Sequence, residues 1–261
     1  MKTFNYHSTK DVKEATKLAS SSSAFLAGGM TTIPSMKLGL ASYKDIIDIK
    51  RIKKLSGIKA SGKSVTIGAT TKHVEVANSK EVKKAIPSLA ALAEGIGDPQ
   101  VRNRGTIGGS IANNDPAADY PSACIALNAT IHTNSRKISA DKFFTGMFET
   151  SLKKGELIEA VEFQVPEKSC YQKYPNPASR YAIVGVYVAK HKKGVNVGVT
   201  GAKSYVYNEK NISSVLSKRF SSSAIDGIKI SSSDMNSDIH GSAEYRANMV
   251  KIFAKKAVDA C

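Results

Sequence analysis

Cysteine and tryptophan are scarce in this chain of 261 residues: tryptophan is absent, and the three cysteines are Cys124, Cys170 and Cys261. The cysteines lie far apart and form no C-x-x-C pair, so they support neither a disulfide framework nor a cysteine-held metal or iron–sulfur site. Isolated thiols of this kind are typical of a reducing compartment, and we therefore expect a cytoplasmic protein. The absence of tryptophan argues mildly against aromatic platforms for stacking nucleic-acid bases.

Long apolar runs are also missing. No run approaches the ~18 residues that a membrane-spanning helix needs, and residues 1–7 lack the apolar core of a secretory signal. We therefore expect no membrane span. An apolar fraction of 41% is ordinary for a globular protein, and the length allows two domains or one large domain.

Acidic residues are outnumbered: 38 Lys and Arg against 22 Asp and Glu give a net charge of +16. Such an excess is compatible with nucleic-acid binding, with a solubilising lysine coat, or with a face that docks an acidic partner. The basic residues come in scattered pairs beside expected turns, such as Lys83-Lys84, without aromatic residues between them. This pattern argues against a nucleic-acid interface, and we expect no nucleic-acid partner.

What the sequence does contain is two glycine pairs with hydroxyl residues beside them. The first is in residues 27–32, Ala-Gly-Gly-Met-Thr-Thr, which follow a short apolar segment that we expect to form a strand. The second is Gly108-Gly109, flanked by Thr106 and Ser110. Paired glycines allow a backbone to pass close to a bulky ligand and to point its N–H groups at it. Both segments therefore suit a phosphate or diphosphate, and together they suggest a ligand held from two sides.

A further glycine motif, residues 57–64, satisfies the P-loop pattern G-x-x-x-x-G-K-S letter for letter. A functional P-loop must open a helix, whereas the residues that follow here are Val65, Thr66 and Ile67, which favour a strand. We therefore predict a β-hairpin with its turn at residues 61–63, and no nucleoside-triphosphate site.

The segment between Pro166 and Pro177 is the best candidate for a domain boundary, with residues 167–169 as a linker. Helix-period and strand-period segments are both present, and we expect an α+β fold. After it we expect strands at 181–189 and 195–199 and helices at 211–220 and 243–258. The sequence thus predicts a domain of residues 1–166, followed by a domain of residues 171–261 with a small antiparallel sheet and helices on one face.

Three stretches, taken in order, resemble the FAD-binding medium subunit of the molybdenum hydroxylases, the xanthine dehydrogenase family. The likeness is greatest to carbon monoxide dehydrogenase and its aldehyde-oxidising relatives. The stretches are residues 27–38, residues 97–119 with the motifs Arg-Gly-Thr-Ile-Gly-Gly and Asp-Pro-Ala-Ala-Asp, and residues 177–186 with Ser-Arg-Tyr-Ala. One glycine pair alone would be unspecific, but the three stretches in this order are specific. The resemblance covers nearly the whole chain and thins after about Lys203.

The resemblance implies a two-lobed PCMH-type FAD-binding domain, with lobes of about 1–57 and 58–166 and FAD between them, ahead of the small C-terminal domain. It also implies that the diphosphate of FAD lies on the two glycine loops and that an aliphatic residue near 157–158 contacts the isoalloxazine. Carried over residue by residue, the implied FAD contacts are Ala27, Gly28, Gly29, Met30, Thr31, Thr32, Thr106, Ile107, Gly108, Gly109, Ser110, Asp119, Leu157, Ile158 and Lys173.

Each of three polar residues can be interpreted in two ways, as a contact of FAD or as a residue with another role. Asp119 either accepts a hydrogen bond from a sugar hydroxyl or caps a helix that begins at Tyr120. Lys173 either stabilises negative charge on a reduced flavin ring or is a solvated linker lysine. His73, near the start of an expected helix, either faces the ligand cleft or has a structural role.

The function implied by the resemblance is that of an FAD-binding electron-transfer subunit with no catalytic residue and no metal ligand of its own. Electrons would come from a small partner subunit with [2Fe-2S] clusters and leave to an external acceptor. Molybdopterin would lie on a large partner subunit. Two alternatives remain open from the sequence: a self-sufficient FAD-dependent oxidase, and a basic nucleic-acid-binding protein.

Overall fold

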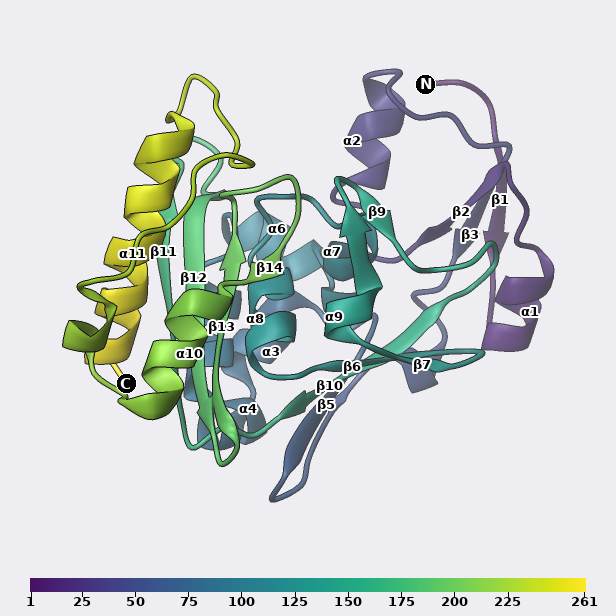
Figure 1. The fold of residues 1–261 in the computed structure, drawn as a ribbon. Helices are drawn as coiled ribbons and strands as arrows, with labels where there is room; N and C mark the ends of the chain where they lie inside the picture. The colour runs from purple at the N-terminus through teal and green to yellow at the C-terminus, as the bar shows by residue number, and fades with distance from the viewer.

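Three β-sheets of three to five strands, with short helices between them, make up the structure, a computed structural model that describes all residues from 1 to 261 (Figure 1). The mixture of helices and sheets confirms the predicted α+β class. None of the helices is both long enough and apolar enough to cross a bilayer.

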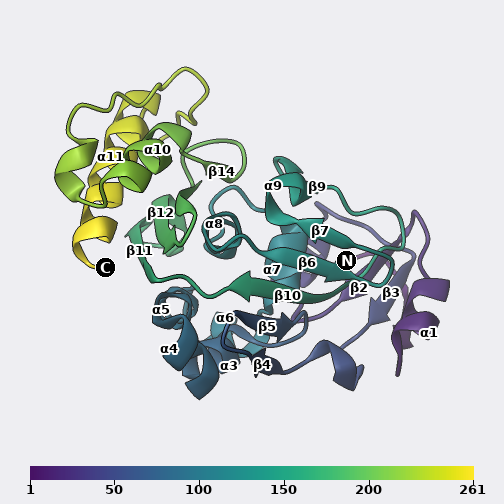
Figure 2. The ribbon, with the colours of Figure 1, turned by 60° about the horizontal axis from the view of Figure 1, so that its bottom comes forward.

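The first sheet is parallel and lies at the end of the molecule opposite to the C-terminal helices (Figures 1 and 2). Its central strand β3 pairs in parallel with both β1 and β2 and buries Ile46 and Ile47. Parallel neighbours need crossover connections, and helices α1 and α2 provide them. The elements are β1 (Asn5–Ser8), α1 (Val12–Lys17), β2 (Ser23–Leu26), α2 (Thr32–Lys37), β3 (Asp45–Asp48) and the 3₁₀ helix η1 (Lys53–Leu55).

The second sheet is antiparallel, with the strand order β4-β5-β10-β6-β7. Its strands are β4 (Ile58–Ala60), β5 (Ser64–Gly68), β6 (Thr130–Thr133), β7 (Lys137–Ser139) and β10 (Ile158–Gln164). Strands β4 and β5 form the hairpin predicted for the P-loop-like motif, with Ser61 N donating to Ser64 O at 2.8 Å. No helix follows Lys63, so this motif lacks the helix start that a P-loop needs.

Seven helices and a small two-stranded ribbon fill the segments between these strands. Their bounds are α3 (His73–Asn78), α4 (Lys80–Ala85), α5 (Pro87–Glu94), α6 (Pro99–Arg104), α7 (Ile107–Asn113), α8 (Tyr120–Ala126), α9 (Ala140–Phe143), β8 (Phe144–Gly146) and β9 (Glu149–Thr150). Together with the second sheet they bury a core of 30 apolar residues, which includes Ile67, Leu89 and Phe163. The second glycine loop packs against this core through Ile107.

The C-terminal sheet is antiparallel and covered by helices on both faces. Its elements are β11 (Lys168–Pro175), β12 (Ala182–His191), β13 (Gly194–Thr200), β14 (Tyr207–Asn208), α10 (Lys210–Lys218), η2 (Ser222–Ile225) and α11 (Ala243–Asp259). Val186 and Val188 of β12 pack with α10 and α11, whereas Tyr187 and Ala189 join the core that contains α8. Figure 2 shows α8 and α11 on either side of this sheet. The antiparallel sheet predicted for this part of the chain is therefore present, and its own helices α10 and α11 lie on one face as predicted, while α8 from the preceding part of the chain covers the other.

The linker expected at residues 167–169 is wrong. Residues Lys168–Pro175 form the edge strand β11, which pairs with β12 over its whole length. An edge strand has one paired side only, and its side chains here are mostly half-buried, so it lacks the apolar alternation that marks an inner strand. The division of the chain into domains of 1–166 and 171–261 stays a prediction.

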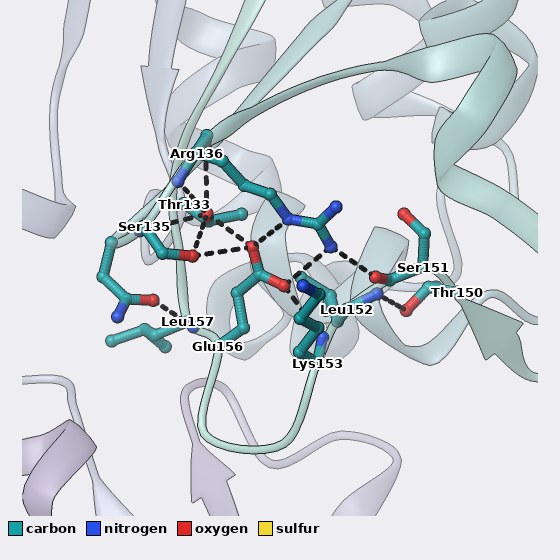
Figure 3. A network of polar contacts seen from close by, with 10 residues as sticks. Thr133, Ser135, Arg136, Thr150, Ser151, Leu152, Lys153, Glu156 and Leu157 are labelled. Atoms are coloured by element: carbon teal, nitrogen blue, oxygen red, sulfur yellow. Dashed lines mark hydrogen bonds and ion pairs between the residues drawn. The ribbon is translucent and has the colours of Figure 1, made fainter.

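An ion pair between the exposed Arg136 and the buried Glu156 fixes the segment that enters β10 (Figure 3). Glu156 is 7% exposed, and its carboxylate receives Nε of Arg136 at 2.8 Å and Nη2 of Arg136 at 2.9 Å. The backbone N–H of Lys153 donates to the same carboxylate at 2.8 Å, and the hydroxyls of Thr133 and Ser135 lie 2.8 and 3.0 Å from it. Every acceptor position of the buried carboxylate thus has a partner, which a buried charge requires.

The same network sets the position of the chain at residue 157. Arg136 Nη2 also donates to Ser151 O at 2.6 Å, and the N–H of Leu157 donates to Oδ1 of Asn134 at 2.7 Å. The turn between β6 and β7 is thereby tied to the loop before β10 at several points. Leu157 and Ile158 are held in one place as a result.

The substitution Glu156→Gln tests this network of hydrogen bonds around the Glu156 carboxylate, which we call the Glu156 clamp. Hydrogen bonds from Arg136, followed by those from Lys153 and the hydroxyls, lower the pKa of Glu156 from 4.5 to about 2. A lowered carboxyl pKa stabilises the fold above pH 4.5, and this contribution is lost as the pH falls toward 2. Urea unfolding of the FAD-free chain at pH 7 is expected to show a loss of about 3 kcal/mol for Glu156→Gln.

The difference between the two proteins should shrink as the pH falls from 5 to 3. The exposed Glu94 at the end of α5 provides the control, and Glu94→Gln should change the free energy of unfolding by less than about 0.5 kcal/mol. An unfolding free energy for Glu156→Gln equal to that of the control at pH 7 would contradict the clamp.

Candidate functional site

The first glycine loop leads from β2 into α2, and its backbone packs directly against the second loop. Gly29 has a φ of +76°, a left-handed conformation that favours glycine. Gly28 has no room for a side chain, because a Cβ there would collide with the carbonyl oxygen of Arg104. Two segments far apart in the sequence therefore meet backbone to backbone.

The second glycine loop connects α6 to α7. Thr106 caps α7, and its Oγ1 accepts a hydrogen bond from Gly109 N at 3.2 Å. Gly108 packs on the end of β5, where its N–H donates to Ala69 O at 2.9 Å and a Cβ would lie 2.5 Å from Cβ of Ala69. By contrast Gly109 is exposed, and Thr106 Oγ1 is the one atom beyond its own helix backbone that a Cβ there would approach within 4 Å.

The two loops face one cavity of about 480 Å³. Thirteen of the fifteen implied FAD contacts line it: Ala27, Gly28, Gly29, Met30, Thr31, Thr32, Thr106, Gly108, Gly109, Ser110, Asp119, Leu157 and Ile158. The cavity is thus bounded by the first sheet, the second glycine loop and the start of β10. These segments come from both sides of residue 57, where the sequence predicts the boundary between two lobes.

Ile107 and Lys173 do not line the cavity. The side chain of Ile107 is fully buried in the central core, so only its backbone belongs to the loop. Lys173 lies behind the wall, where its Nζ is 3.0 Å from Oδ1 of Asp119 and donates to Gly95 O at 2.8 Å. A side chain that is 11% exposed is not a solvated linker lysine, so that alternative is wrong.

Asp119 is a buried carboxylate at the cavity wall, 4% exposed. Burial raises its pKa, while the charge of Lys173 and the hydrogen bond from the hydroxyl of Tyr171 oppose this rise. Its side chain makes no capping hydrogen bond to α8, although it occupies the position before that helix. The alternative role as a helix cap is therefore not supported, and the carboxylate keeps acceptor capacity toward the cavity.

Several further residues line the cavity that the sequence did not single out as FAD contacts. They include the apolar Phe25, Ile49, Ile96, Val101 and Leu152, and the polar Asn113, Asp115, Ser179 and Arg180. Arg180 has a φ of +62°, and its carbonyl accepts a hydrogen bond from Lys173 at 3.0 Å. The Ser-Arg-Tyr-Ala motif was the available signal for this turn, but the sequence does not reveal that the turn reaches the cavity.

The charges around the cavity are mainly negative. Asp115, Asp119 and Glu156 line it, whereas Arg180 is the one lysine or arginine that does. An anionic group bound here would therefore depend on backbone N–H donors of the first loop and on hydroxyls of both loops, because the N–H groups of Ile107, Gly108 and Gly109 already donate within the protein. The geometry fits a ligand whose diphosphate lies at the loops and whose uncharged, partly apolar groups lie farther along the cavity.

Comparison with known proteins agrees with this description. The family described as "FAD binding domain in molybdopterin dehydrogenase" matches residues 2–167. The glyceraldehyde dehydrogenase medium chain of Sulfolobus acidocaldarius is 35% identical over 271 residues, covering 97% of this chain and 96% of the relative. The carbon monoxide dehydrogenase medium chain of Hydrogenophaga pseudoflava is 34% identical over 278 residues, covering 98% of this chain and 96% of the relative.

Solved structures show the same fold. A structure of carbon monoxide dehydrogenase from Hydrogenophaga pseudoflava that lacks the Mo-pyranopterin moiety matches with a TM-score of 0.89 at 32% identity, covering 99% of this chain and 97% of that chain. Reconstituted CO dehydrogenase from Oligotropha carboxidovorans matches with a TM-score of 0.90 at 28% identity, with the same coverage of 99% and 97%. These findings confirm the resemblance and the FAD cofactor that the sequence predicts. The chain belongs to the family of FAD-binding subunits of the molybdenum hydroxylases.

Proposed function

We propose that this chain is the electron-transfer subunit of a molybdenum hydroxylase complex and that it holds FAD in the cavity between its two glycine loops. The observation that carries the proposal is the meeting of residues 27–32 and 106–110 at one cavity. FAD, when bound, supplies the redox chemistry. The work of the chain is to hold the cofactor and to set its surroundings.

The diphosphate of FAD would lie on the two loops. Exposed Gly109 lets a phosphate approach the first turn of α7, and the backbone N–H groups at Gly28 and Gly29 approach it from the other side. Thr31, Thr106 and Ser110 supply hydroxyl donors nearby. These donors carry no full charge. Binding of the diphosphate by them therefore does not require a lysine or arginine in a cavity that is lined by carboxylates.

The sugar and the ring would lie farther along the cavity. Asp119, held by Lys173 and Tyr171, would accept a hydrogen bond from a sugar hydroxyl of FAD. Leu157 and Ile158, fixed by the clamp at Glu156, would contact the isoalloxazine with an apolar surface. Residues positioned by this hydrogen-bond network would hold the ring in one orientation, which an electron-transfer site needs.

Partner subunits follow from the medium chains to which this chain is similar. We infer a large subunit that carries molybdopterin and a small subunit that carries [2Fe-2S] clusters, with electrons passing from the small subunit to FAD. The rival proposal, a self-sufficient oxidase, would require a substrate pocket in the C-terminal part. Helices cover both faces of the sheet there, which favours the electron-transfer role.

Gly109→Ala separates FAD binding from folding. Gly109 is exposed and lines the cavity, so a methyl group at this position adds bulk to the cavity wall and should weaken FAD binding at least about tenfold. The FAD-free variant should unfold within about 1 kcal/mol of the parent, because the helix preference for alanine over glycine opposes the close approach, 3.0 Å, of the new Cβ to Thr106 Oγ1. Titration of the full chain with FAD, followed by flavin fluorescence, measures the first effect, and thermal unfolding measures the second.

Gly62→Ala is the matched control, because a Cβ at Gly62 has no atom within 4 Å. It lies in the P-loop-like hairpin and should leave FAD affinity unchanged. If Gly62→Ala lost FAD while Gly109→Ala retained it, the dinucleotide would bind at the P-loop-like motif of residues 57–64. That result would refute the proposal.

The electron-transfer role predicts a dependence on partners. Native mass spectrometry of the complex purified from its source should find this chain with a large molybdopterin-containing subunit and a small two-iron subunit. Glyceraldehyde and carbon monoxide are the compounds in the names of two relatives. Added to the isolated chain, each should leave FAD oxidised, while dithionite should reduce it. Direct reduction of FAD by an organic substrate in the isolated chain would support the self-sufficient oxidase instead.

A further inference from the structure

His73 is a buried residue at the cavity that has no assigned partner in FAD binding. It is the first residue of α3, its side chain is 4% exposed, and it lines the cavity. Its backbone N–H donates to Gly105 O at 3.0 Å, which holds the start of α3 against the second glycine loop. The imidazole therefore lies directly behind the backbone that leads to Thr106.

The protein offers no hydrogen-bond partner to this imidazole. Nδ1 is enclosed and unpaired. The edge with Nε2 faces Gly105, where a Cβ would lie 2.5 Å from Nε2, so only glycine lets the loop pass so close to the ring. On its other side the ring packs against Tyr120, with centroids 5.4 Å apart, and the hydroxyl of Tyr120 is also buried without a partner.

The imidazole is neutral at ordinary pH. Burial, and secondarily the charge of Arg102, lower the pKa of His73 to about 4. A neutral imidazole carries one N–H donor and one acceptor nitrogen. A buried donor that finds no acceptor destabilises a protein, and native structures rarely leave one so. Nε2 makes no hydrogen bond within the protein, and His73 lines the cavity, so a proton on Nε2 can be donated to a group that enters there.

We propose that His73 binds FAD directly, its Nε2–H donating a hydrogen bond to an oxygen of the diphosphate segment held by the second glycine loop. This inference rests on the proposed function, because it needs FAD in this cavity. Nδ1 is enclosed by protein, so Nε2 is the nitrogen left for a ligand. The segment of ligand within its reach is the part bound beside Gly105 and Thr106, because the ring lies against Gly105.

Matched variants of the full chain test this contact. His73→Phe keeps an aromatic ring of similar size and removes the donor, so FAD should bind about tenfold more weakly. His73→Gln places an amide N–H near the former Nε2 and should restore binding to within about threefold of the parent. Tyr120→Phe removes the other unpaired polar atom of this cluster without touching the cavity, and it should leave FAD affinity unchanged.

A spectroscopic measurement on the unmutated chain separates a ligand contact from a structural role. In ¹⁵N NMR of the histidine rings, addition of FAD should shift Nε2 of His73 and fix the tautomer with the proton on that nitrogen. FAD affinity unchanged in His73→Phe, or a His73 signal that FAD does not alter, would overturn the inference. If Gly109→Ala weakens FAD binding in the same assay, the proposed function stands and only the role of His73 fails. If neither variant affects FAD, the cavity itself is wrong.

Discussion

The contact between Gly28 and the carbonyl of Arg104 is the constraint on which the site depends. A side chain at residue 28 would push the first sheet away from the second glycine loop, because a Cβ there would collide with this carbonyl oxygen. With glycine at this point, the backbone of residues 27–32 meets the backbone that leads into α7, and the cavity forms between them. Gly108, pressed against Ala69, anchors the second loop to the central core in the same manner. The backbone approaches that bring the loops together thus require residues without a Cβ.

The charge distribution is a second consequence of that arrangement. The chain has a net charge of +16, yet the cavity wall carries carboxylates at Asp115, Asp119 and Glu156. Two of these charges are stabilised from behind the wall, Asp119 by Lys173 and Glu156 by Arg136. The cations therefore act as supports for the wall, and an anionic ligand is left to backbone N–H groups and neutral donors. Most of the positive charge lies elsewhere on the chain, away from the cavity.

The sequence predicted the features that depend on local chemistry. The glycine loops and the hairpin at residues 61–63 could be found because glycine and β-branched residues act over a few positions. Strand β11 was missed since an edge strand lacks apolar alternation, and the enclosure of Lys173 was left open because its partners lie on other elements. The exposure of His73 to the cavity could not be read from α3 alone, because it depends on Gly105 more than thirty positions later. What the sequence could not supply was therefore long-range packing.

The most direct test of this account is an experimental structure of the chain with FAD bound. The diphosphate is expected between residues 27–31 and 106–110, with backbone N–H groups of the first loop and hydroxyls of both loops directed at it and the ring beside Leu157 and Ile158. A diphosphate bound at Gly62-Lys63-Ser64, or FAD that contacts only one of the two glycine loops, would contradict the account.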